Sequence, residues 1–386
     1  MPKLAISNIG TIASGDINQA VLEGNTIVIE DGLIKAIGDE SLLAGEDNCR
    51  VIDAGGATVI PGLFDSHVHV TLGDFGHRQL THNFIDSALH GGVTSMISAG
   101  EVHTPGRPKD PAGTKALALL THKSFNNLKP SGVKVHAGAL ILEKGLVEKD
   151  FEELAAEGVW LVGEVGLGSI SEANEASEMV AWAHKNNFKV QMHTGGTSIP
   201  GSSTVTAKDV MTVAPDVVSH INGGPTAVAL YDIDHLMDDS DFTLEIVQCG
   251  NPKIADYVLR RAKEKGMLGR IIFGNDAPSG TGVIPLGILR NISFAASISD
   301  IDPADAICMA TGNTARTYGL NTGIIEPGRE ADLLIIDAPM GSVADTAFDA
   351  LAAGDIPGLT YVLIDGEVKV KKSRNTPPSK KATKEI

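Results

Sequence analysis

The chain has 386 residues, a formal net charge of −17 and 42% hydrophobic residues. This length is long for a single ordinary domain but suits an α/β barrel with a small appendage. The acidic balance argues against nucleic acid or an anionic membrane as the main partner, because no basic surface dominates. We expect a cytoplasmic protein, because the cysteines are widely separated. The sequence also shows neither a signal-peptide pattern nor an apolar stretch of membrane-spanning length.

Short strands are predicted at both ends of the chain. Alternating apolar residues flank Asp31-Gly32 and Asp365-Gly366, and both dipeptides are typical of two-residue hairpin turns. Neither end has enough residues to bury a core alone, so residues 1–56 and 327–372 are expected to form one small β-sandwich domain. The last residues, 373–386, are basic and unpatterned, which predicts a flexible tail.

Between these ends, apolar β-branched runs alternate with helical patterns, the clearest of which are Asp150–Glu157, Glu172–His184 and Pro252–Lys265. Strands are predicted at Thr58–Leu63, Val93–Ser98, Val133–His136, Val159–Gly163, Lys189–Met192, Val217–Ser219, Thr243–Val247 and Arg270–Phe273. This alternation predicts the α/β class, with a (β/α)8 TIM barrel over residues 57–326.

The fragment PGLFDSHVHV places His67 and His69 two residues apart after an apolar run. Side chains at positions i and i+2 of a strand point to the same face, so both imidazoles can reach one point in space. An H-x-H pattern also occurs by chance, and it becomes informative only through the fragments that follow it.

Those fragments each place a potential ligand just past a predicted strand. They are GVWLVGEVGLG with Glu164, FKVQMHTGG with His193, DVVSHINGG with His220, and IIFGNDAPSG with Asp276. In a barrel, catalytic side chains gather at this end of the strands. Each residue alone has a structural alternative, such as a helix cap for Asp276 or a core histidine for His193. Together, four histidines and two carboxylates predict a site for zinc or iron(II) rather than calcium or magnesium.

These motifs, with PGREADLLIID at Pro327–Asp337, resemble the amidohydrolase superfamily over essentially the whole chain. The resemblance implies that His67 and His69 bind a buried metal ion together with Asp276. It implies a second metal ion at His193 and His220.

Many superfamily members bridge the two metals with a carboxylated lysine at the end of strand 4. No lysine lies between Val159 and Ser171, so the resemblance assigns the bridge to Glu164. A glutamate supplies a similar pair of negative oxygens. Because this departs from the common pattern, a site with one metal remains an alternative.

The resemblance points most closely to the members that open cyclic amides in anaerobic nicotinate breakdown. It implies hydrolysis of 1,4,5,6-tetrahydro-6-oxonicotinate to 2-formylglutarate and ammonia, a Zn2+ and Fe2+ pair, and a homotetramer. Metal-bound hydroxide would attack the amide, and Asp276 would pass the proton to the leaving nitrogen.

A substrate of this kind carries a carboxylate, which needs cationic or hydrogen-bonding partners. Arg78 and Arg107 lie in loops after predicted strands 1 and 2, and Thr197 and Asn222 follow strands 5 and 6. They are the candidates for substrate binding. Surface charge on long loops is the alternative for both arginines.

Enzymes with other functions would use the same set of metal ligands. An imidazolonepropionase-like, dihydroorotase-like or deaminase-like enzyme would use the same residues on a different ring. A non-enzymatic scaffold with the same fold is the alternative from another class, although such proteins tend to lose ligands. Metal analysis and a panel of ring substrates discriminate among these hypotheses.

Overall fold

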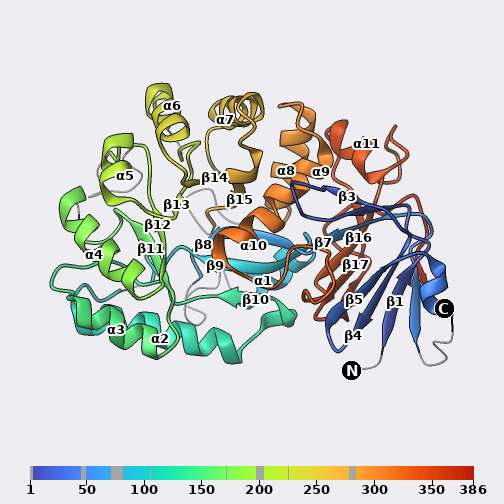
Figure 1. Cartoon of the computed structure of the whole chain (residues 1–386), viewed down its shortest axis with the longest axis horizontal. Coiled ribbons are helices and arrows are strands. Elements are labelled where there is room, and N and C mark those ends of the chain that lie inside the picture. The colour runs from blue at the N-terminus through green and yellow to red at the C-terminus, as the bar shows by residue number, and fades with distance from the viewer. Residues whose placement is uncertain are drawn as a thin grey trace.

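The computed structural model describes residues 3–44, 49–70, 81–104, 106–170, 172–196, 204–224, 226–277 and 284–386. The chain is an α/β protein with two parts (Figure 1). The larger part alternates parallel strands with helices, and the smaller part contains strands from both ends of the chain. Within the described ranges, no helix is both long and apolar enough to cross a membrane.

In the described residues, eight parallel strands form the larger part, and a helix follows each of them. The strands are β8 (Leu63–Val68), β9 (Val93–Ser98), β10 (Lys134–His136), β11 (Leu161–Val165), β12 (Lys189–Met192), β13 (Val217–Val218), β14 (Thr243–Val247) and β15 (Ile271–Gly274). The helices that follow are α1 (Thr81–Leu89), α2 (Pro111–Asn127), α3 (Glu148–Ala156), α4 (Ala173–Lys185), α5 (Ala207–Val213), α6 (Leu230–Asp239), α7 (Pro252–Glu264) and α8 (Gly287–Ser297). Then come α9 (Pro303–Met309) and α10 (Gly312–Tyr318).

Strands β8 to β10 pair in one sheet and strands β11 to β15 in another. Isolated parallel bridges connect these sheets, one between Val68 and Ala277 and one between Leu140 and Val162. The backbone N–H of His69 also donates to the carbonyl of Ala277 at 2.9 Å. The C-terminal ends of the first and last parallel strands therefore lie against each other.

The smaller part contains sheets with the orders β19-β6-β1-β4-β5 and β18-β17-β16-β7-β2-β3. Their strands are β1 (Leu4–Ser7), β2 (Thr11–Ala13), β3 (Val21–Leu22), β4 (Thr26–Glu30), β5 (Leu33–Gly38), β6 (Arg50–Asp53), β7 (Thr58–Pro61), β16 (Leu333–Asp337), β17 (Gly358–Ile364), β18 (Glu367–Lys371) and β19 (Lys384–Glu385), with α11 (Ala347–Ala352) between β16 and β17. Ile6, Ile27, Ile335 and Leu363 are fully buried in one hydrophobic cluster, so both ends of the chain share a core.

The two predicted hairpins are present. Strands β4 and β5 pair across Asp31-Gly32, and β17 and β18 pair across Asp365-Gly366. All four turn residues have positive φ, between 51° and 80°, which is the conformation that a type I′ turn requires at both central positions.

The prediction that Thr58–Leu63 is the first strand of the barrel is wrong. Residues Thr58–Pro61 form β7, which pairs with β2 and β16 of the smaller part. The chain then passes Gly62 and enters β8, which contains His67. A methyl group on Gly62 would lie 2.1 Å from Oγ1 of Thr94, so only glycine fits at this crossing. One continuous apolar run carries no signal for a change of sheet.

The predicted flexible tail is also wrong for most of its length. Strand β19 pairs antiparallel with β6. The backbone N–H and the Nζ of Lys381 donate to the buried carboxylate of Asp337 at 2.8 and 3.0 Å. The basic residues of this segment find acidic partners that are remote in sequence, which a local pattern cannot reveal.

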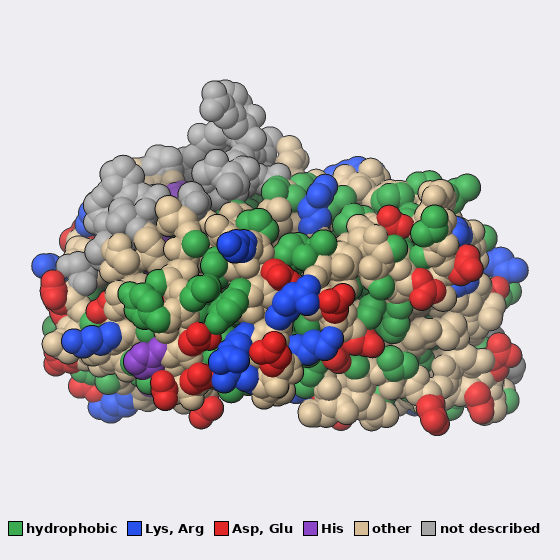
Figure 2. All heavy atoms as spheres, turned by 90° about the horizontal axis from the view of Figure 1, so that it is seen from above, with side chains coloured by type: hydrophobic (Ala, Val, Ile, Leu, Met, Phe, Trp, Pro, Cys, Tyr) green, Lys and Arg blue, Asp and Glu red, His purple; other side chains and the backbone are tan. Residues whose placement is uncertain are grey.

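The surface carries its charge in a mixed pattern. Figure 2 shows acidic and basic side chains interspersed over the visible face of the molecule. Lys115, for example, contacts both Asp150 and Glu153, at 2.6 and 2.7 Å. Among the described residues, this face therefore presents no extended basic patch of the kind that binds nucleic acid.

Candidate metal centre

Six donor side chains of the described residues meet where parallel strands end, and their donor atoms form two groups of three. Within each group the atoms lie within 4.8 Å of one another. The six are His67 in β8, His69 after it, Glu164 in β11, His193 after β12, His220 after β13 and Asp276 after β15. The sequence predicted all six residues near strand ends. In the structure, their side chains converge there.

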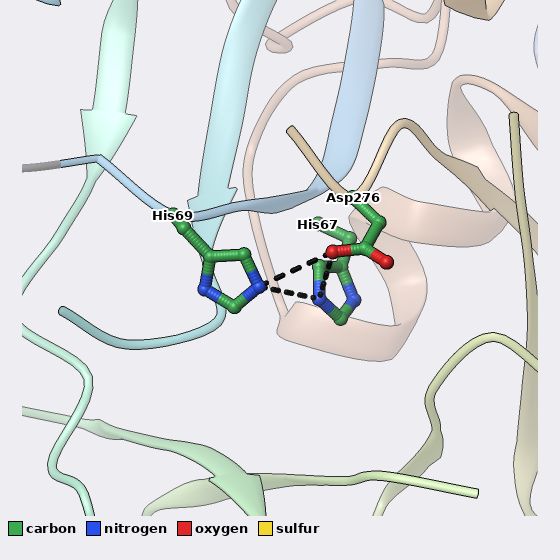
Figure 3. Close-up of side chains that lie close together, drawn as sticks. All are labelled: His67, His69 and Asp276. Carbon is green, nitrogen blue, oxygen red and sulfur yellow. Dashed lines mark hydrogen bonds and ion pairs between the residues drawn. The ribbon is translucent and has the colours of Figure 1, made fainter. Parts of the chain in front are cut away.

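The first group contains His67, His69 and Asp276, which point toward one another (Figure 3). The two Nε2 atoms of the histidines are 3.3 Å apart. Oδ1 of Asp276 lies 3.3 Å from Nε2 of His69 and 3.7 Å from Nε2 of His67. One small cation between these three atoms would contact all of them.

The second group contains Glu164, His193 and His220. Nε2 of His220 lies 2.7 Å from Oε1 of Glu164 and 3.1 Å from Nδ1 of His193. Nδ1 of His193 lies 3.8 Å from the same carboxylate oxygen. All three side chains are buried.

Glu164 joins the two groups. Its Oε2 lies 3.5 Å from Nε2 of His67 and 3.6 Å from Nε2 of His69, whereas its Oε1 faces His193 and His220. One carboxylate therefore directs one oxygen to each group. This is the geometry that a ligand bridging two cations requires.

The ring nitrogens that face away from the centre already have partners. Nδ1 of His67 lies 2.7 Å from Oε2 of Glu245, and Nδ1 of His69 lies 3.0 Å from the carbonyl oxygen of Gly100. Each Nδ1–H donates to its oxygen, so each Nε2, once it carries no proton, presents a lone pair to the centre. Two lone pairs 3.3 Å apart fit a shared cation. Imidazole and carboxylate donors suit zinc or iron(II).

Electrostatics also favour cations here. Burial opposes charge on Glu164, but the imidazoles of His67 and His220 outweigh it and hold the pKa of that carboxyl well below its ordinary value. In the same way, Glu245 and Glu164 overcome burial and raise the pKa of His67 well above its ordinary value. The carboxylate of Glu164 therefore remains ionised, and the centre favours positive charge, either as protons on the imidazoles or as a cation that displaces those protons.

Two of the donor residues have a backbone conformation that L-residues rarely adopt. His220 has a φ of 34° and Asp276 a φ of 57°. Such conformations cost about 1–3 kcal/mol each and cluster at functional sites. Close packing supports the conformation of Asp276. A methyl group on Gly274 would lie 2.7 Å from Cβ of His67, so β15, which precedes Asp276, passes directly against β8.

The predicted substrate-binding residues have different outcomes. Nη1 of Arg107 lies 2.5 Å from Oε1 of the buried Glu143, so its charge is already paired. The carboxamide of Asn222 bonds the backbone N–H and carbonyl of Val247, at 3.0 and 2.9 Å, and fastens neighbouring strand ends together. Both residues thus have structural partners. Arg78 and Thr197 lie outside the described residues.

The sequence interpretation missed Glu245. This residue is fully buried in β14, and its second oxygen accepts a hydrogen bond from Oγ of Ser66 at 2.5 Å. A charged residue inside the apolar strand TLEIV is the signal that could have identified it. His103 also approaches the centre: its ring packs edge-on against that of His69, with centroids 4.9 Å apart.

Comparisons with known proteins identify the family of this chain. The Amidohydrolase family matches residues 58–369, and the chain belongs to this family. It is 67% identical over 384 residues to an enamidase from Eubacterium barkeri, covering 100% of both chains. A crystal structure of enamidase superposes with a TM-score of 0.97 at 66% identity, again over 100% of both chains. A dihydroorotase from Pelotomaculum thermopropionicum is 23% identical over 425 residues, covering 92% of this chain and 95% of its own.

Proposed function

We propose that this protein is an enamidase, a metal-dependent hydrolase that opens a cyclic amide. The observation that carries the proposal is the carboxylate of Glu164, which directs one oxygen to each of two groups of metal donors. The identity of 67% to an enamidase over the full length supports 1,4,5,6-tetrahydro-6-oxonicotinate as the substrate. The products are then 2-formylglutarate and ammonia.

We infer that the eight described parallel strands close into a (β/α)8 barrel. The support is their order together with the bridges Val68–Ala277 and Leu140–Val162, which join the two sheets at both of their edges. The terminal strands would form a β-sandwich from residues 1–56 and 327–372. Because β7 pairs with β16, this domain would extend to Pro61 and the barrel would begin after Gly62.

The donor set fits two divalent cations, and we propose Zn2+ and Fe2+. His67, His69 and Asp276 would hold one, His193 and His220 the other, with Glu164 between them. When bound, such cations polarise an amide carbonyl and lower the pKa of a water molecule toward neutrality.

The proton transfers fall to Asp276. Its Oδ1 is turned toward the centre, and its pKa is held below the ordinary value because the imidazoles of His69, His67 and His220 outweigh burial. As a carboxylate it accepts the proton of the attacking water and returns it to the ring nitrogen while the C–N bond breaks. The enamine released tautomerises to an imine, and a second water converts this to the aldehyde and ammonia.

For the substrate carboxylate, we propose Arg78 and Thr197. The support is their place in the chain, after β8 and after β12, together with the pairing of Arg107 to Glu143. We also propose a cytoplasmic homotetramer: the resemblance supports the tetramer, and the widely separated cysteines support the cytoplasm. Light scattering of the purified protein tests the assembly.

The test is a substrate panel with metal analysis. The purified protein should contain close to two transition-metal ions per chain and should release ammonia from the oxonicotinate lactam. Dihydroorotate, an imidazolone and adenine should be inert. Turnover of one of these rings with an inert lactam would replace enamidase with another amidohydrolase activity. A metal-free protein indifferent to chelators would support the non-enzymatic scaffold instead.

A further inference from the structure

The thiol of Cys249 contacts the proposed proton carrier. Its Sγ donates a hydrogen bond to Oδ2 of Asp276 at 3.2 Å. The other oxygen, Oδ1, faces His69 and His67 at 3.3 and 3.7 Å. The carboxylate is therefore held between the metal donors on one side and a thiol on the other.

The position of Cys249 is fixed from two sides. It lies in the turn that follows β14, where the backbone N–H of Gln248 donates to the carbonyl of Gly274 at 2.9 Å. The carboxamide of Asn222 bonds both backbone groups of Val247. The backbone before Cys249 is thus fastened to the ends of the strands on either side.

Asp276 needs such a support. Its φ of 57° places the residue in the left-handed region, and its side chain is the most exposed of the six donors, at 18% against 0–5% for the others. A carboxylate that both contacts a cation and moves a proton must keep one oxygen in a fixed orientation.

We propose that Cys249 is a positioning residue: its thiol holds Oδ2 of Asp276, so that Oδ1 stays directed at the reaction centre. This inference rests on the proposed function, because it assumes that Asp276 transfers the proton. The chemistry that position 249 must supply is a small hydrogen-bond donor. Serine meets that requirement and alanine does not.

The experiment compares Cys249→Ala with Cys249→Ser. In Cys249→Ala, kcat should fall by about tenfold, the order of one lost hydrogen bond to a charged group, while KM and metal content stay near those of wild type. Cys249→Ser should retain kcat within about threefold, since the hydroxyl donates in place of the thiol. Cys308→Ala is the matched control, because Cys308 is buried in α9, which carries none of the six donors, and its removal should leave kcat unchanged.

Equal losses in the alanine and serine variants, or an unchanged kcat in Cys249→Ala, would overturn the proposal. Crystal structures give a readout that does not depend on activity. Wild type should show Sγ within hydrogen-bond distance of Oδ2, and Cys249→Ala should show a rotated Asp276 carboxylate. An inactive wild-type protein would count against the proposed function, whereas an unrotated carboxylate would count against the role of Cys249.

Discussion

Oε2 of Glu245 lies 2.7 Å from Nδ1 of His67, and both side chains are fully buried. The carboxylate of Glu245 thus contacts the ring nitrogen of His67 that faces away from the group of donors. The carboxylate fixes the tautomer of the ring and increases the basicity of Nε2. Strand β14 provides none of the six donors, yet through Glu245 it orients one of them.

Replacing Glu245 should therefore weaken metal binding, although none of the six donor residues is changed. In Glu245→Gln, we expect metal affinity to fall about 10–100-fold, the usual effect of losing a hydrogen-bonded partner of a ligating histidine. Metal retained after dialysis against graded chelator concentrations measures this. Ser66→Ala is the control, because it removes only the hydroxyl that holds the other oxygen of Glu245. An equal loss in both variants would contradict the prediction.

Replacing Glu164 should change the number of metal ions. Glu164→Gln keeps the shape but removes the negative charge that both donor groups face, so the metal content should fall from two ions toward one. Elemental analysis of the purified variant provides the count. Glu143→Gln makes the same change at a buried glutamate that pairs with Arg107, and it should keep both ions. Full occupancy in Glu164→Gln would exclude a bridging role.

Replacing Asp276 should separate chemistry from binding. In Asp276→Asn, kcat should fall about 10²–10⁴-fold because the amide cannot accept and return the proton. Most of the metal should remain, since the other donors are unchanged. Steady-state kinetics and elemental analysis of the same preparation test both statements. Asp305→Asn, in the first turn of α9, should behave as wild type. A kcat within tenfold of wild type would reject the role of Asp276.

Acid should destabilise the protein through His136. Burial lowers its pKa to about 4 from 6.5, and its Nε2 has no hydrogen-bond partner among the described residues. Because the folded-state pKa of His136 lies below its unfolded value, protonation of the ring favours unfolding. The stability that the neutral ring permits is therefore present above pH 6.5 and is lost as the pH falls toward 4. The loss is at most about 3 kcal/mol.

Urea unfolding between pH 7 and 4.5 measures this effect. His136→Gln should give a shallower dependence on pH than wild type. His235→Gln is the control, because the ring of His235 is half exposed on α6. Parallel pH dependences for wild type and His136→Gln would show that another group causes the acid sensitivity.

The donors could be predicted because their signal is local. Each follows an apolar run, and equivalent ends of successive parallel strands bring such positions together. The roles of Glu245 and Cys249 could not be predicted, because each contacts a donor that is remote in sequence. For the same reason, the pairing of Arg107 with Glu143 and of Lys381 with Asp337 could not be predicted. The break between β7 and β8 escaped detection because apolar periodicity continues through Gly62.

That break couples the centre to the far end of the chain. Strand β7, one residue before the strand that carries His67, lies between β2 and β16 in its sheet. During synthesis β7 emerges early, but β16 is made only after all six donors have been translated. Strand β7, which leads into the strand of His67, thus gains its neighbour β16 late. The donor set is therefore expected to become rigid only when the C-terminal strands have been made. Truncation from the C-terminus should accordingly disrupt metal loading, although every ligand is still present.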